Sequence, residues 1–273
     1  MTLYELITAA VADLSEFGYD GPERLERWIE RLRAKIVEIQ PSIGKSAELL
    51  NGSLKAIYER LVEKDGVLRN SKISRFTLER LKPSLRAELD RRIVASASLI
   101  RLNRSKSIEQ TIQRFAGWAT SIPIGGSGVV DKIAIKTEVR KPLSQLPYEE
   151  RRVLIDQGHK LAASINDIVA EGGNAIAAEW FSHWRQKNYR FRKDHKERDG
   201  KFYAIRGSWA IEKGLLNKGE GYTDEITKPG EEIFCRCEYR YVYSLRDLPP
   251  EMLTVKGKNA LDTARGAKAK VYA

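Results

Sequence analysis

The residues of this sequence that are best suited to chemistry are one histidine and two closely spaced cysteines. Cys235 and Cys237 are its only cysteines, and His195 precedes them in a segment rich in charged side chains. Zinc in proteins prefers thiolate and imidazole ligands, usually four ligands in a tetrahedron. Asp194 or Asp199 could supply the fourth ligand. His195, Cys235 and Cys237 are therefore one candidate for a zinc site.

The pattern around the cysteines favours a different interpretation. Residues 231–243, EEIFCRCEYRYVY, alternate over their whole length, which is typical of a β-strand. On a straight strand the Cα atoms of residues i and i+2 are about 6–7 Å apart, too far for two sulfurs on one ion. We therefore expect both thiols to pack as small buried side chains without a cofactor, and the zinc site is the alternative. The face expected to be buried carries Ile233, Cys235, Cys237, Tyr239, Tyr241 and Tyr243. Arg236 lies on the opposite face, where we expect it to bind a carboxylate.

The Asp194–His195 pair suggests a second chemical interpretation, because it is similar to the start of the motif in ββα-metal nucleases. In such enzymes a histidine activates water, while a carboxylate or a second histidine holds the cation. They also need further ligands on a following helix, whereas His159 and His183 both precede the pair. We therefore expect no enzymatic activity and no small-molecule substrate. A metal-dependent DNA-processing protein is the alternative function.

The segment around His195 is also strongly basic. Residues 185–206 contain nine basic and three acidic residues, interleaved with four aromatic ones, and the whole chain has a net charge of +11. Such a surface can neutralise phosphates and stack on bases, so we expect DNA to be a candidate partner. An acidic protein surface, or a solvated face above a core of aromatic residues, would also explain the pattern. The candidate DNA-binding residues are Arg190, Arg192, Lys193 and Lys196.

The elements that precede this segment are predicted to be helices. Over the first 120 residues, apolar side chains recur at helical spacing in narrow stripes with charged opposite faces. Such helices pack together or against a partner protein. The stripes are Leu25, Trp28, Ile29, Leu32 and Ile36; Leu50, Leu54, Ile57, Tyr58 and Leu61; Leu85, Leu89, Ile93, Ala97 and Ile100; and Ile108, Ile112, Phe115 and Ala119.

After residue 120 the pattern changes several times. Residues 121–147 contain glycines, prolines and a strand-like alternation in KIAIKTEV, which predicts a loop or a β-hairpin arm. A helix is predicted from Tyr148 to Glu171, and a short one from Asn174 to Gln186 with Trp180 and Trp184 on one face. Short strands and turns follow, and the basic end of the chain shows no lasting period, which favours an extended tail.

Together these patterns predict an α+β protein with a mainly helical N-terminal region and a small C-terminal α+β module. The expected organisation is a helical region at 1–120, an arm or linker at 121–147, the module at 148–250 and a basic tail at 251–273. Hydrophobic residues make up 42% and charged residues 31% of the 273 residues, which is typical of globular proteins. No apolar run reaches the roughly 20 residues that a membrane helix needs, and the beginning is a poor signal peptide. We therefore expect a protein made in a cytoplasm, with no membrane partner and with reduced thiols.

Three motifs in the C-terminal half resemble a known family. YRFRKDHKERDGK at 189–201, a Pro-Gly turn at 229–230 and Cys-Arg-Cys at 235–237 occur in this order, and Trp180 precedes them. This order is similar to the C-terminal motif of the phage Mu F-type family of minor head or head-morphogenesis proteins, and the resemblance covers residues 180–240. The residues that match the family motif are Arg192, His195, Asp199, Gly200, Pro229, Cys235, Arg236 and Cys237.

The resemblance implies a structural protein of a bacteriophage virion, made in the host cytoplasm. Such a protein acts in head morphogenesis, near the portal vertex or inside the capsid. Its expected partners are the portal or other capsid proteins, and packaged DNA is a further candidate. These expectations come from the resemblance and not from composition or spacing.

Overall fold

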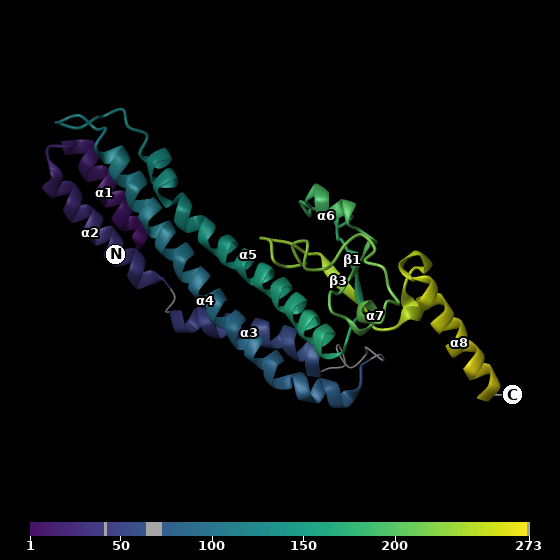
Figure 1. The fold of residues 1–273 in the computed structure, drawn as a ribbon. Coiled ribbons are helices and arrows are strands. Elements are labelled where there is room, and N and C mark those ends of the chain that lie inside the picture. The colour runs from purple at the N-terminus through teal and green to yellow at the C-terminus, as the bar shows by residue number, and fades with distance from the viewer. Residues whose placement is uncertain (41–42, 64–72, 272–273) are drawn as a thin grey trace. The chain divides into compact units, whose positions relative to one another are not determined.

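The computed structural model describes residues 1–40, 43–63 and 73–271, which form a mainly helical chain with one small sheet (Figure 1). The predicted α+β class is confirmed. The chain divides into two compact units, Met1–Asn51 with Val94–Leu154, and Gly52–Ile93 with Ile155–Ala273. Two long helices, α4 (Arg75–Ala119) and α5 (Lys132–Gly172), contribute to both units. The units are therefore not divided at residues 120 and 148, where the sequence pattern changes.

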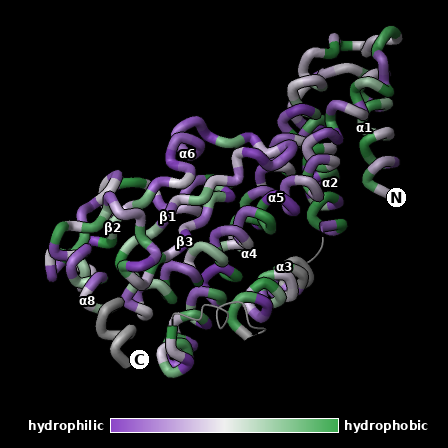
Figure 2. The backbone as a smooth tube through the Cα atoms, turned by 90° about the vertical axis from the view of Figure 1, so that its right-hand side faces the viewer, coloured by the Kyte–Doolittle hydropathy of each residue, from purple (hydrophilic) through white to green (hydrophobic). Residues whose placement is uncertain are grey.

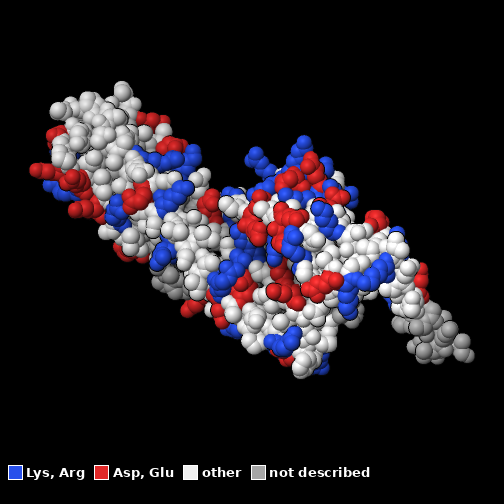
Figure 3. Space-filling view, viewed as in Figure 1, with Lys and Arg blue, Asp and Glu red and all other residues white. Residues whose placement is uncertain are grey.

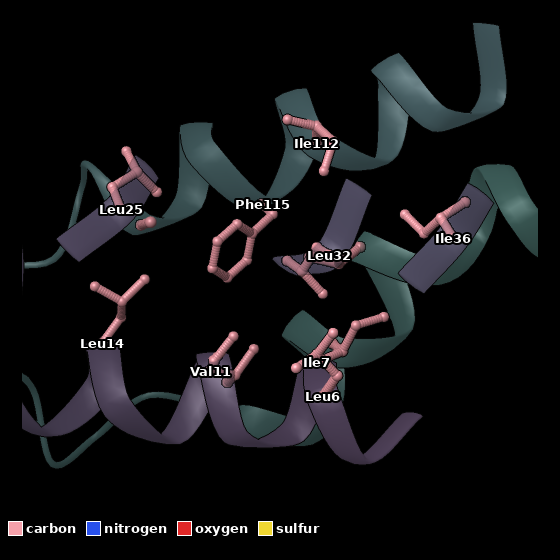
Figure 4. Close-up of a cluster of buried hydrophobic side chains, with 12 residues drawn as sticks. Leu6, Ile7, Val11, Leu14, Leu25, Leu32, Ile36, Ile112 and Phe115 are labelled. Atoms are coloured by element: carbon pink, nitrogen blue, oxygen red, sulfur yellow. The ribbon is translucent and has the colours of Figure 1, made fainter. Parts of the chain in front are cut away.

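The first unit is built around α1 (Leu3–Phe17) and α2 (Pro22–Ile39). A capping box begins α1, with Thr2 and Glu5 each bonded to the other's backbone N–H, and Pro22 occupies the first turn of α2. Figure 4 shows side chains of both helices meeting Ile112 and Phe115, and Phe115 is fully buried. The apolar stripe of α2 therefore packs inside this chain, so it is not a surface left open for a partner. The buried members of this core are Leu6, Ile7, Ala10, Val11, Leu14, Leu25, Leu32, Ile36, Ile112, Phe115, Ala119 and Val139.

The helical part of the second unit contains α3 (Ile43–Tyr58), the π-helix η1 (Glu59–Glu63) and segments of α4 and α5. The sequence separates α4 into two helices after Pro83, but the structure has one helix that continues through this proline. Leu78 and Leu85, on either side of Pro83, are both buried in the same core, so packing holds the helix together. Figure 2 shows hydrophobic and hydrophilic residues alternating along α4 and α5.

The predicted arm at 121–147 is wrong in its second half, because α5 already begins at Lys132. Asp131 accepts the backbone N–H groups of Ile133 and Ala134 at 3.0 Å each, as an N-cap does. The alternation in KIAIKTEV hides a helical stripe, since Ile135, Val139 and Leu143 at i, i+4 and i+8 pack on the core of the first unit. Pro142 and Pro147 both lie inside the helix.

The C-terminal module, residues 174–271, is organised around a three-stranded antiparallel sheet. Its strands are β1 (Ala177–Phe181), β2 (Phe202–Ala204) and β3 (Glu238–Val242), in the order β2-β1-β3. The helix predicted at 174–186 is therefore wrong. β1 is the central strand, and Ala177, Ala178 and Trp180 are fully buried. A strand buried on both faces has no period of two and can be mistaken for a helix.

The predictions for both ends of the module also need correction. The strand predicted at 231–243 is confined to β3, and Ile233 is 65% exposed instead of buried. The tail predicted to be extended forms α8 (Val255–Val271), which follows Thr254, whose hydroxyl accepts the N–H of Gly257. The remaining elements are α6 (Lys193–Glu197), α7 (Trp209–Glu212), η2 (Leu245–Asp247) and η3 (Pro250–Met252). None of the helices that the structure describes combines the length and the apolarity needed to cross a bilayer.

Candidate metal centre

A tight turn before β3 sets the position of Cys235. Phe234 has a left-handed backbone, with φ of 59°, and its N–H donates to the buried carboxylate of Asp156 at 2.7 Å. The N–H of Cys235 donates to the carbonyl of Glu232 at 3.2 Å, which closes the turn. Cys235 and Cys237 therefore precede β3 and do not lie on a straight strand. The separation of about 6–7 Å expected for a straight strand therefore does not apply to these two residues.

The structure brings the two sulfurs and the histidine together. Nδ1 of His195 lies 3.7 Å from Sγ of Cys235 and 3.5 Å from Sγ of Cys237. The ligand atoms of these three residues all lie within 4.8 Å of one another, and none of the side chains is more than 5% exposed. Among the residues that the structure describes, this is the one group of three or more such side chains.

These distances fit a metal ion. With Zn–S bonds of about 2.3 Å and Zn–N bonds of about 2.0–2.1 Å, a tetrahedral site separates sulfur from nitrogen by about 3.6 Å. The two observed separations lie within 0.1 Å of this value. The separations between the nitrogen and each sulfur are therefore compatible with a shared zinc ion.

The protonation of the two thiols is unequal in a way that favours a cation. A hydrogen bond from Cys237 lowers the pKa of Cys235 to about 4, and His195 acts in the same direction. The neighbouring Cys235 sulfur and burial both raise the pKa of Cys237. The pKa of Cys235 is thus lowered and that of Cys237 raised. A bound cation would stabilise both residues as thiolates.

The second nitrogen of the histidine ring faces a carboxylate. Nε2 of His195 lies 3.0 Å from Oε2 of Glu232. This distance suits a hydrogen bond, but the angles at the two atoms do not meet the geometry of one. Arg192 holds Glu232 in place, since its Nε lies 2.8 Å from the same oxygen and its guanidinium also donates to the carbonyl of Ile233. Metal-binding histidines commonly present their other nitrogen to a carboxylate, which orients the ring and raises its basicity. Glu232 was not identified from the sequence.

The two aspartates proposed as a fourth ligand have other partners. Asp199 accepts the backbone N–H of Ser182 at 2.8 Å and the indole N–H of Trp184 at 2.9 Å, so it fixes the loop after β1. Asp194 pairs with Arg198 at 3.0 Å. The hydroxyl of Ser182 instead lies 3.7 Å from Sγ of Cys237. Neither aspartate belongs to the ligand group found among the described residues.

Three other residues singled out in the sequence lie around the same cluster. Trp180 is fully buried and meets the His195 ring edge-on, with 5.1 Å between ring centroids. Gly200 has a φ of 77° and donates its N–H to the carbonyl of Trp180 at 2.8 Å. Pro229 is buried, and the backbone of Gly230 hydrogen-bonds the sulfur of Cys235.

Arg236 differs from its expected role. It forms no carboxylate ion pair within the described part of the chain; its guanidinium binds Oε1 of Gln186 at 3.0 Å and lies over the ring of Tyr189. Together with His159 and His183 it lines a hollow of about 230 Å³ beside Cys237. Burial, Arg236 and His183 lower the pKa of His159. Neither His159 nor His183 belongs to the metal-ligand group.

The four predicted DNA-binding residues separate into two kinds. Arg190, Lys193 and Lys196 are exposed on or beside α6. Arg192 is instead bound to Glu232 and to the Ile233 carbonyl, so it supports the carboxylate that faces His195. Comparison of the chain with protein-family models, curated proteins and solved structures found no match.

Proposed function

We propose that this protein is a bacteriophage minor head protein whose C-terminal module is stabilised by one zinc ion bound to His195, Cys235 and Cys237. The observation that carries the proposal is the convergence of the motif. Residues that match the motif, up to 45 positions apart between Arg192 and Cys237, meet around the buried group of His195, Cys235 and Cys237, with Arg192 bound to Glu232 beside it. A chance match of short motifs would not favour such a meeting.

Each residue of the motif has a definable task in this arrangement. His195, Cys235 and Cys237 would bind the ion, and water or the Ser182 hydroxyl would supply the fourth ligand. When bound, zinc would supply folding free energy, since it joins α6 to the turn before β3. Such a link would help to stabilise a module whose sheet has three strands.

Burial supports a structural role for the ion in preference to a catalytic one. A catalytic zinc keeps a position open to substrate, whereas the ligands here are 1%, 1% and 5% exposed. The proposed function is therefore assembly of the phage head near the portal vertex or inside the capsid, through contacts with portal or other capsid proteins. The protein would be located in the virion.

Mass spectrometry of purified particles from the phage or prophage that encodes this chain tests the proposal. The chain should be present in far fewer copies than the major capsid protein. Its absence from intact particles would overturn the structural role. A metal-dependent nuclease is the alternative, and DNA nicking that stops on addition of a chelator and returns with metal would favour it.

A further inference from the structure

A row of exposed cations lies on the loop between β1 and α6 and continues onto α6. We call it the cationic strip; it consists of Arg185, Lys187, Arg190, Lys193 and Lys196. All five side chains are exposed, and Lys193 is 91% exposed. Figure 3 shows lysine and arginine side chains projecting around α6, with acidic residues between them and below.

The carboxylates near the strip are engaged elsewhere. Asp194 pairs with Arg198, and Asp199 is held by Ser182 and Trp184. Glu232 pairs with Arg192 and faces His195. Within the described residues, the one carboxylate that reaches the strip is Glu197, whose oxygen lies 3.8 Å from Nζ of Lys193. Four of the five cations therefore have no acidic partner among the residues that the structure describes.

Aromatic rings hold part of the strip in place. Lys196 lies 4.3 Å and Arg185 lies 4.7 Å from the ring of Trp184, and Lys196 also approaches Phe191. The indole N–H of Trp184 is fixed by Asp199, so the ring cannot turn away. Because cations already cover this ring, it is poorly suited to stacking on an unpaired base. The arrangement presents positive charges to a ligand and offers few groups for reading base edges.

We infer that the cationic strip binds the phosphate backbone of double-stranded DNA without regard to sequence. Exposed cations, four of them without an acidic partner among the described residues and two packed on Trp184, match a surface of regularly spaced phosphates, and binding would release the counterions of the DNA. The inference rests on the proposed function in one respect, namely that the metal ligand His195 fixes α6 and hence Lys193 and Lys196. It also names a partner for the proposed head protein, namely the packaged duplex.

Salt-dependent binding of the full-length, zinc-loaded protein to a labelled duplex of arbitrary sequence tests this inference. The strip variant replaces Arg185, Lys187, Arg190 and Lys196 with glutamine. The control variant replaces four other exposed lysines of the same module with glutamine, namely Lys213, Lys218, Lys256 and Lys258. Both variants lose four positive charges, so a difference between them cannot come from net charge.

Each phosphate contact contributes about 0.9 to the slope of log K against log salt concentration. The strip variant should therefore show a slope that is shallower by about 3.6, while the control variant should keep most of the parent slope. Tighter binding to a duplex than to a single strand is also expected.

Three results would overturn the inference: no binding to duplex at low salt, equal losses in both variants, or a preference for single strands. Equal losses would assign the binding to net charge. The zinc content of both variants should equal that of the parent, because none of the replaced residues is a ligand. A strip that fails to bind DNA while the chain is found in virions would leave the proposed function standing.

Discussion

Asp199 fixes the loop that follows β1, and its replacement by asparagine tests how the C-terminal module is held together. One carboxylate oxygen accepts the N–H of Ser182 and the other accepts the indole N–H of Trp184. Asparagine keeps one acceptor but turns an N–H₂ group toward the second donor. Hydrogen bonds to a charged group contribute about 1.5–3 kcal/mol each, and the surviving bond loses its charge. Asp199→Asn should therefore lower the free energy of unfolding by about 2–4 kcal/mol.

Urea unfolding, combined with NMR of the five tryptophan indole N–H groups, measures this effect. The native signal of Trp184 should shift upon mutation, whereas those of Trp28 and Trp118 in the first unit should not. Asp224→Asn is the matched control, because this carboxylate is half exposed and pairs with Arg206 at the surface. The control should change stability far less. A loss below about 0.5 kcal/mol for Asp199→Asn, or an unmoved Trp184 signal, would refute the assigned role.

Three further predictions concern the core, the half-buried Asp167 and the carboxylate beside His195. Phe115→Ala should cost about 3–5 kcal/mol in thermal or urea unfolding, because the ring is fully buried, while zinc content stays unchanged. Burial raises the pKa of Asp167, so the stability that this group contributes is complete at low pH and is lost as pH rises through the raised value. Asp167→Asn still accepts the Tyr241 hydroxyl and should flatten the dependence of stability on pH above about pH 4; an unchanged profile would contradict this. Glu232→Gln should weaken zinc binding about 10–100-fold in chelator competition with the fold retained, and unchanged affinity would exclude its part in orienting His195.

Helical stripes were predictable because their periodicity is local. The stripes of α2 and of the end of α4 contain the residues that form the first core, including Leu32 and Phe115. Local patterns failed where tertiary contacts decide the structure. The sequence of β1 lacks the alternation of a strand because it is buried on both faces, and α4 continues through Pro83 because both flanks pack into one core.

The site was only partly predictable for a similar reason. His195, Cys235 and Cys237 are identifiable by residue type. The alternation of apolar and polar residues over 231–243, however, predicts that the two cysteines lie on a straight strand. The turn at Phe234 depends on Asp156, which is 78 residues away, and no local pattern indicates such a contact. Glu232 was missed because an acidic residue in an alternating segment looks like a solvated side chain. Its importance follows from its distances to His195 and Arg192, which only the fold reveals.

The central claim is that His195, Cys235 and Cys237 bind one structural zinc ion, and elemental analysis of the full-length protein, purified under reducing conditions, tests it most directly. The account predicts one equivalent of zinc per chain, with cobalt substitution giving thiolate-to-metal absorption, and loss of both in a Cys235→Ser, Cys237→Ser double variant. A parent protein that contains no zinc, and takes up none when zinc is supplied, would contradict the account, as would a double variant that still binds a full equivalent.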